Sequence, residues 1–196
     1  MRLIEKMAVV TNTENGVAVT NDDEVRALLN TVDVEYERWD LSRVAADATA
    51  DEVLSAYSDE IDAMKRRCGF VTADVIDITP EVPGLETMLA KFDKEHTHSD
   101  DEVRFIIGGR GIFFLRGMEG QVLSVEVVPG DLIRVPRGTT HWFTLCTERR
   151  IRAIRWFQDP AGWSPNYTWS GVDREFEPLC FGPAYFGTLA QKTISL

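Results

Sequence analysis

The stretch His96-Thr97-His98-Ser99-Asp100-Asp101-Glu102 decides how the rest of the chain is interpreted. Alternate side chains of a strand share one face, so His96 and His98 are predicted to point the same way. A turn at 99–101 would let Glu102 join them from a returning strand. A second stretch, GDLIRVPRGTTH at 130–141, ends in His141, the last of three histidines in the chain. These four side chains form a candidate metal site.

The donor types indicate which metal such a site would take. Three neutral imidazole nitrogens and one carboxylate suit a divalent transition metal, and four ligands leave two positions of an octahedron open. Iron or nickel fits this best. A lone histidine is more often a hydrogen-bonded core residue, and Glu102 alone would be a solvated turn acid. The placement of every histidine in one spaced set favours the metal site.

Both stretches resemble the two motifs of the cupin superfamily. The first motif, His-x-His, then a glutamate, then six residues and a glycine, is matched by residues 96–109. The second is matched by Gly130, Pro136, Gly138 and His141. The whole chain is similar to the acireductone dioxygenase family, above all in KEHTHSDDEVRF at 94–105. The resemblance implies a mainly β fold, a cupin-type antiparallel β-barrel (double-stranded β-helix or jelly roll) with a few peripheral helices.

The resemblance also implies an activity in methionine salvage, with one Fe²⁺ or Ni²⁺ per chain. The substrates would be O₂ and the acireductone 1,2-dihydroxy-5-(methylthio)pent-1-en-3-one. Iron would give 4-methylthio-2-oxobutanoate and formate; nickel would give 3-(methylthio)propanoate, formate and carbon monoxide. Glu95 would act in metal incorporation and Asp101 in relaying conformational change, although solvated surface positions are the alternative for both. Another metal-dependent cupin dioxygenase or isomerase, or a non-catalytic small-molecule-binding cupin, remains as an alternative function.

A pocket around the metal can be outlined from strand alternation. Arg104 should share the face of Glu102, where its charge would attract an anion and promote formation of the acireductone dianion. The alternative is an exterior arginine, which would need a bulge between 102 and 104. Arg155 is favoured over Arg152 as a second pocket cation, although alternation does not decide between them. The candidate pocket residues are Phe92 (if the segment before His96 is extended), Phe143, Arg155 and Trp163, with plain core packing as the alternative for the aromatic residues.

Short apolar segments separated by glycine and proline predict the strands of the barrel. They lie at 71–79, 102–107, 111–116, 121–128, 132–135, 141–146 and 151–158. Gly108-Gly109-Arg110-Gly111 favours a hairpin. Before the barrel, residues 1–20 are strand-like with a turn at Asn15-Gly16, Asn21 is a helix N-cap, and 32–41 is extended. A capping box at Thr49 and Glu52 begins one helix that ends at Gly69.

Composition limits the remaining possibilities. A chain of 196 residues with 44% hydrophobic residues is expected to form a single cupin domain, 1–196. Within this domain, the N-terminal strands and helices (1–70) would pack on the metal-binding barrel, which would comprise residues 71–158. The aromatic C-terminal tail (159–196) would cover the barrel. A net charge of −11 argues against binding to nucleic acid or an anionic membrane. Three widely spaced cysteines, Cys68, Cys146 and Cys180, indicate reduced thiols, and no secretory or membrane segment is evident. We therefore expect a cytoplasmic monomer.

Overall fold

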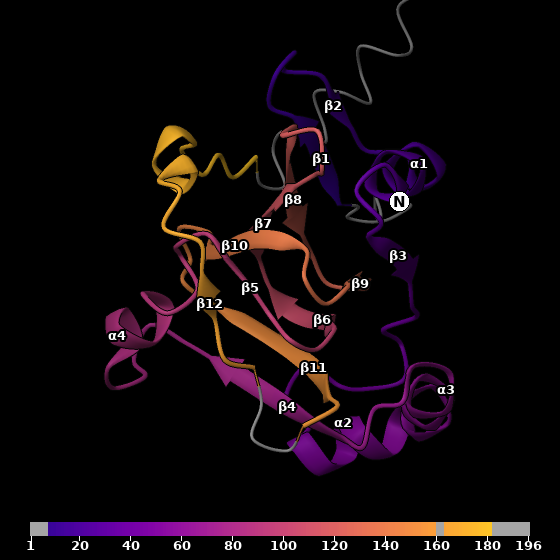
Figure 1. The fold of residues 1–196 in the computed structure, drawn as a ribbon. Helices are drawn as coiled ribbons and strands as arrows, with labels where there is room; N and C mark the ends of the chain where they lie inside the picture. Colours follow the sequence, from indigo (N-terminus) through magenta and orange to yellow (C-terminus); the bar gives the residue numbers. More distant parts are fainter. Residues whose placement is uncertain (1–7, 160–162, 182–196) are drawn as a thin grey trace, which may run out of the picture.

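Two antiparallel sheets form the framework of the protein (Figure 1). The computed structural model describes residues 8–159 and 163–181. The first sheet has the order β12-β5-β10-β7-β8-β1-β2 and the second has the order β3-β9-β6-β11-β4. The strands are β1 (Val9–Asn12), β2 (Ala18–Val19), β3 (Glu35–Arg38), β4 (Thr72–Ile78), β5 (His96–Thr97), β6 (Glu102–Gly109), β7 (Gly111–Arg116), β8 (Val122–Val127), β9 (Asp131–Val135), β10 (Thr140–Leu145), β11 (Ile151–Phe157) and β12 (Asn166–Tyr167). The helices are α1 (Asp22–Asn30), α2 (Ala50–Ala56), α3 (Ser58–Cys68), α4 (Leu85–Leu89) and the 3₁₀ helix η1 (Val172–Glu175).

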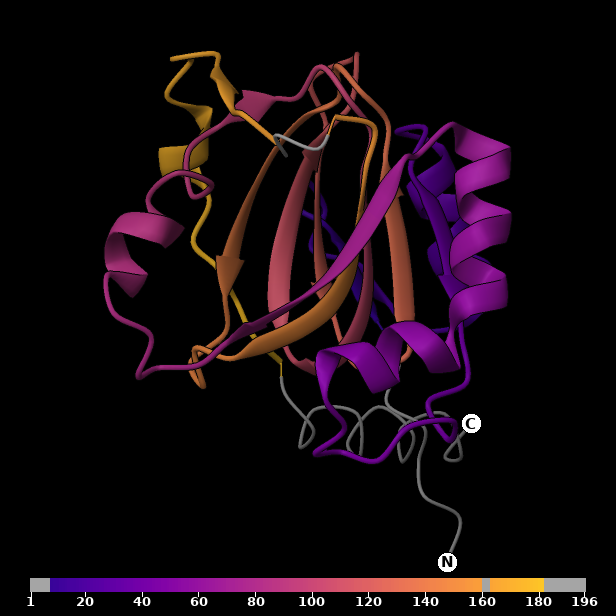
Figure 2. The same ribbon diagram turned by 90° about the horizontal axis from the view of Figure 1, so that it is seen from below.

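The main core lies between the two sheets. Phe113 and Phe143 of the seven-stranded sheet belong to the same buried cluster as Ile106 and Ile133 of the five-stranded sheet. Figure 2 shows the sheets curving around this interior, with α2 and α3 outside the five-stranded one. The mainly β, cupin-type fold predicted from the sequence is confirmed.

The segment Gly108–Gly111 is not a hairpin, so that prediction was wrong. β6 pairs with β9 and β11, whereas β7 pairs with β8 and β10. The chain passes here from one sheet to the other. Gly109 has a φ of 72°, and a Cβ on it would lie 2.0 Å from the Arg150 carbonyl oxygen. The glycine is therefore required by a close approach of two backbones. β5 and β6 also belong to different sheets, so Glu102 begins a strand that does not return along β5.

The helix predicted between Thr49 and Gly69 is two helices. The capping box of Thr49 with Glu52 and the left-handed Gly69 at the end are confirmed. Between them, Tyr57 leaves helical geometry, with φ −111° and ψ 20°. Its buried ring packs on Phe105, and its hydroxyl donates to the Asp40 carbonyl oxygen at 2.7 Å. Apolar periodicity continues across Tyr57 because both helices bury residues against the five-stranded sheet, so the pattern did not reveal the break.

The cysteines differ from the expectation of reduced thiols. Cys146 and Cys180 form a disulfide, and only Cys68 is free. The cause is the path of the C-terminal segment, which pairs through β12 with β5 and then crosses the outer face of the seven-stranded sheet. The part of the predicted tail at 160–162 and 182–196 lies outside the described residues. Among the described residues, no helix combines the length and apolar character needed to cross a membrane.

Candidate metal centre

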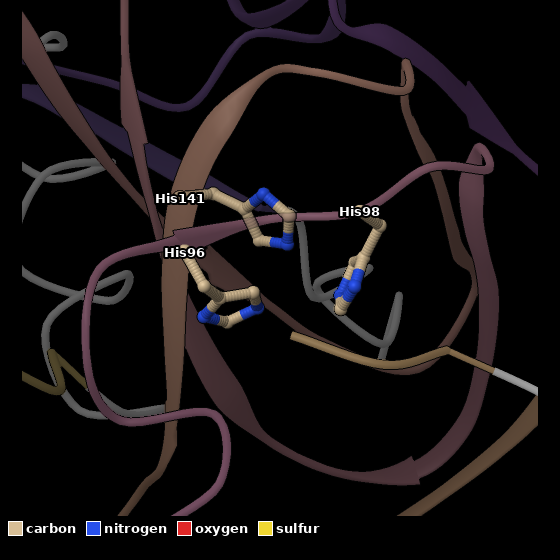
Figure 3. A group of neighbouring side chains, drawn as sticks. All are labelled: His96, His98 and His141. Carbon is tan, nitrogen blue, oxygen red and sulfur yellow. The ribbon is translucent and has the colours of Figure 1, made fainter. Parts of the chain in front are cut away.

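The three histidines meet at one end of the barrel (Figure 3). His96 in β5 and His141 in β10 are direct partners across neighbouring strands, and His98 follows β5. All three are buried, and one ring nitrogen from each lies within 4.8 Å of the others. The fold thus brings together residues 45 positions apart in the sequence because β5 adds to the edge of β10.

Backbone carbonyl groups fix the orientation of each imidazole. Nδ1 of His96 lies 2.6 Å from the Lys94 oxygen, Nδ1 of His141 lies 2.8 Å from the Thr139 oxygen, and Nδ1 of His98 lies 3.0 Å from the Ser164 oxygen. A carbonyl oxygen only accepts hydrogen bonds, so each Nδ1 must carry the proton. Each Nε2 then keeps its lone pair for the centre of the cluster. Neutral imidazoles oriented in this way are the form that binds metal ions.

Glu102 contributes a carboxylate to the same space. Its Oε2 lies 3.1 Å from Nε2 of His98 and 3.3 Å from Nε2 of His141. Burial, the largest single influence, raises the pKa of Glu102, but the Arg104 guanidinium together with the neighbouring His141 and His98 holds it well below its usual range. Charged Oε2 and unprotonated Nε2 are all acceptors, which repel one another at this separation unless a cation lies between them.

The environment of His96 keeps its ring neutral. Burial, together with the neighbouring His141, lowers the pKa of His96 from 6.5 to about 4. Its Nε2 is buried and has no hydrogen-bond partner among the described residues. A buried polar atom without a partner is costly in a folded protein. The donor set and this unpaired nitrogen fit a divalent transition metal ion.

Arg104 lies beside the histidine cluster. It is 4% exposed, and its Nε donates to Oε1 of Glu102 at 2.6 Å. The guanidinium carbon lies 4.9 Å from the ring centre of Phe143, 5.3 Å from that of Trp163 and 5.7 Å from that of Phe113. Aromatic faces attract a cation and exclude water from it. A fixed positive charge therefore adjoins the cluster in an apolar setting.

The other predicted pocket aromatics are also close. The ring of Trp163 stacks on His98 with centroids 6.1 Å apart, and its indole nitrogen donates to the Asp101 carbonyl oxygen. The ring centres of Phe92 and His96 lie 5.8 Å apart. The segment before His96 is a turn, however, and not the extended chain from which the position of Phe92 was predicted. A backbone hydrogen bond from Phe143 to the Phe92 carbonyl oxygen holds that turn against β10.

The two arginines of β11 have different surroundings. Arg155 is the register partner of Arg104, and its guanidinium carbon lies 5.7 Å from the ring centre of Trp163. Its Nε and Nη2 donate to the Asp74 carboxylate at 2.9 and 2.6 Å. Arg152 instead donates to carbonyl oxygens of residues 46 and 48, away from the histidines. Of the two, Arg155 is the one that contacts Trp163, the ring that stacks on His98.

Glu95 and Asp101 are buried rather than solvated, so the surface alternative for them was wrong. Glu95 is 2% exposed and lies 3.1 Å from an Arg116 nitrogen, and hydroxyl groups of Thr168 and Ser170 also donate to it. Asp101 accepts from Arg134 at 2.8 Å and from the backbone nitrogen of Arg137 at 2.9 Å. Sequence reasoning missed these partners, because each is at least 21 residues away and no local pattern connects the pairs.

A barrel of two antiparallel sheets that buries three oriented imidazoles and a carboxylate at one end defines a metal-binding cupin. Comparison with known proteins narrows this class. The model of the ARD/ARD' family matches residues 9–165. The acireductone dioxygenase of Bacillus cytotoxicus is 40% identical over 170 residues, which cover 82% of this chain and all of that protein. The enzyme of the same name from Marinobacter nauticus is 42% identical over 150 residues, 76% of this chain and 80% of the relative.

A solved structure gives the same result. The acireductone dioxygenase from Bacillus anthracis, with a cadmium ion in its active centre, superposes with a TM-score of 0.78 and 38% identity. It covers 83% of this chain and 99% of its own. The chain belongs to the ARD/ARD' family, and it is a metal-dependent dioxygenase.

Proposed function

We propose that the chain cleaves the acireductone 1,2-dihydroxy-5-(methylthio)pent-1-en-3-one with O₂, using one divalent metal ion held by His96, His98, Glu102 and His141. The observation that carries this proposal is the convergence of unprotonated histidine nitrogens and a charged carboxylate beside a buried arginine. When bound, the metal would supply Lewis acidity and two positions that chelate the adjacent oxygens of the substrate.

The residues around the metal have separate tasks in this proposal. Arg104 stabilises the negative charge that develops when the acireductone loses its protons, and this charge makes the substrate reactive towards O₂. The rings of Phe143 and Trp163 exclude water from the guanidinium, which strengthens its effect. Phe92, which lies beside His96, and Arg155, which lies beside Trp163, would complete the wall of the pocket. The carbonyl groups that accept from the three Nδ1 atoms hold the imidazoles in the binding tautomer.

We propose that the identity of the metal decides the products, as expected from the family resemblance. With Fe²⁺, one carbon–carbon bond breaks and the products are 4-methylthio-2-oxobutanoate and formate. With Ni²⁺, two carbon–carbon bonds break and the products are 3-(methylthio)propanoate, formate and carbon monoxide. Both sets contain all atoms of the substrate and one O₂. A different chelate of the substrate with each metal would direct the attack to different carbons.

The test is O₂-dependent decay of acireductone by metal-free protein reloaded separately with Fe²⁺ and Ni²⁺, with formate and carbon monoxide quantified. We expect rapid decay with both metals and carbon monoxide with nickel alone. Unreloaded protein and the protein-free solution are the controls. Decay no faster than without protein would refute the substrate assignment, whereas equal product ratios would refute only the role of the metal identity.

A further inference from the structure

The C-terminal segment 163–181, called the strap here, runs from the metal centre to the far side of the seven-stranded sheet. Near its start, the Ser164 carbonyl oxygen accepts from Nδ1 of His98, and Tyr167 pairs with His96 through β12 and β5. Farther along, Val172 and Phe176 pack on the buried cluster that contains Trp142. One continuous segment therefore contacts two of the three histidines and the outer face of the strand that carries the third.

The strap also holds Glu95, the residue immediately before His96. The backbone nitrogen of Thr168 donates to the Glu95 carbonyl oxygen at 3.1 Å. The hydroxyl groups of Thr168 and Ser170 both donate to Oε2 of Glu95, whereas Arg116 contacts Oε1. Removal of the strap would leave one side of a buried carboxylate without its donors, which is costly enough to move it. Because Glu95 adjoins His96, its movement would be felt by the metal centre.

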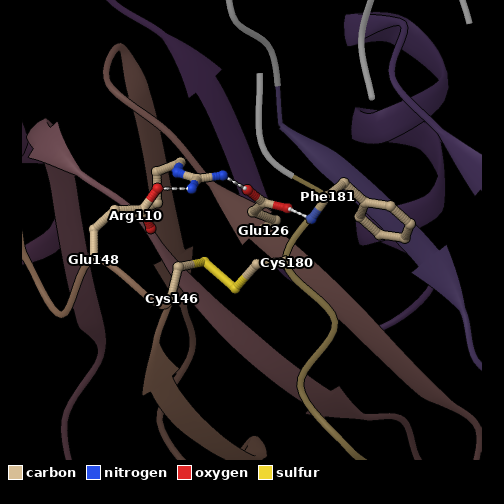
Figure 4. Close-up of a disulfide and its surroundings, with 6 residues drawn as sticks. All are labelled: Arg110, Glu126, Cys146, Glu148, Cys180 and Phe181. Atoms are coloured by element: carbon tan, nitrogen blue, oxygen red, sulfur yellow. Dashed lines mark hydrogen bonds and ion pairs between the residues drawn. A yellow bond between two sulfur atoms is a disulfide. The ribbon is translucent and has the colours of Figure 1, made fainter. Parts of the chain in front are cut away.

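Two contacts fix the end of the strap (Figure 4). Cys180 is bonded to Cys146, which directly follows the strand carrying His141, with a Cα–Cα distance of 5.9 Å. Next to it, the backbone nitrogen of Phe181 donates to Glu126 at 2.6 Å, and Arg110 donates to the other oxygen of that buried carboxylate. The disulfide is the covalent one of these two attachments.

We propose that the strap is a redox-sensitive clamp on the metal centre, in which Thr168 and Ser170 position Glu95 and the Cys146–Cys180 disulfide locks the strap in place. This rests on the proposed metal-dependent function. A dithiol reductant opens the lock: its thiolate attacks the disulfide, a mixed disulfide forms, and its second thiol displaces the protein sulfur. Cys146 and Cys180 gain two electrons and two protons and become thiols, and the dithiol becomes a disulfide. The freed strap then leaves Glu95 more often, and the metal dissociates faster.

The test measures the rate at which nickel leaves the loaded full-length protein for a colourimetric chelator, without reductant. C146S/C180S removes the lock, and C68S is the matched control because Cys68 is remote from the strap. T168V/S170A removes the positioning hydroxyl groups with the disulfide intact, and T168S, which keeps a hydroxyl at that position, is its matched control. Hydrogen exchange of 163–181 is followed in the same samples.

We expect nickel release at least tenfold faster from C146S/C180S and from T168V/S170A, with C68S and T168S within twofold of the wild type. Exchange in the strap should rise in C146S/C180S. Equal release rates in all variants, with exchange raised in the strap, would overturn the coupling between strap and metal. Unchanged exchange in C146S/C180S would overturn the lock. A wild type that binds no nickel would instead refute the proposed metal centre, so the two failures are distinguishable.

Discussion

Replacement of His96 by asparagine should flatten the pH dependence of stability in the metal-free protein. Burial and His141 lower the pKa of this histidine from 6.5 to about 4. Between these values the unfolded chain takes up a proton that the folded protein refuses, so the histidine costs stability as the pH falls through this window. The full effect is about 3 kcal/mol, and about 2 kcal/mol of it falls between pH 7 and pH 5.

The assay is urea unfolding of chelator-treated protein at several pH values from 7 to 5, above the pI of about 4.7 where solubility is lowest. Asparagine keeps a donor for the Lys94 carbonyl oxygen and does not titrate, so lost packing shifts the curve of H96N by a constant amount. The wild type should lose about 2 kcal/mol more than H96N over this range. Parallel curves for the two proteins would refute the claim that the fold keeps His96 neutral.

Two further predictions concern Arg104 and Gly109. R104A should retain its metal but lose turnover about 100-fold, because the charge beside the substrate is gone; metal analysis and steady-state kinetics measure the two effects. The control is R67A, a change at the partly exposed surface of α3. Unchanged turnover in R104A would exclude the arginine from the mechanism. G109A should lower the free energy of unfolding by about 3 kcal/mol, since the added Cβ meets the Arg150 carbonyl oxygen in a left-handed conformation. G120A has a positive φ but open space around it and should cost about 1 kcal/mol, so equal melting temperatures of the two variants would contradict the steric explanation.

Local patterns were sufficient for most of the framework. The barrel strands begin and end within two residues of the predicted ranges, because alternation and glycine or proline breaks are properties of each strand by itself. The closeness of His96, His98 and Glu102 was predicted for a similar reason, because few residues separate them in the sequence. That they hold a metal stays a prediction.

Pairing between strands could not be derived from these patterns. Gly108–Gly111 has the composition of a hairpin, yet the turn leads into the other sheet, since the partner of a strand is decided by residues elsewhere in the chain. The disulfide was missed because 34 residues separate its cysteines and only the path of the strap brings them together. The partners of Glu95 and Asp101 were missed because they too lie far away in the sequence, at separations of 21 residues or more.

The division of the candidate metal ligands between the two sheets has a consequence for the whole molecule. His96 and His141 belong to the seven-stranded sheet, and Glu102 begins a strand of the five-stranded sheet. An ion coordinated by all of them would be a crosslink between the two halves of the barrel. At a free concentration 1,000 times its dissociation constant, such an ion adds about 4 kcal/mol to the stability of the fold. Metal supply would then govern the lifetime of the protein as well as its chemistry, since chains without an ion open more often at this end.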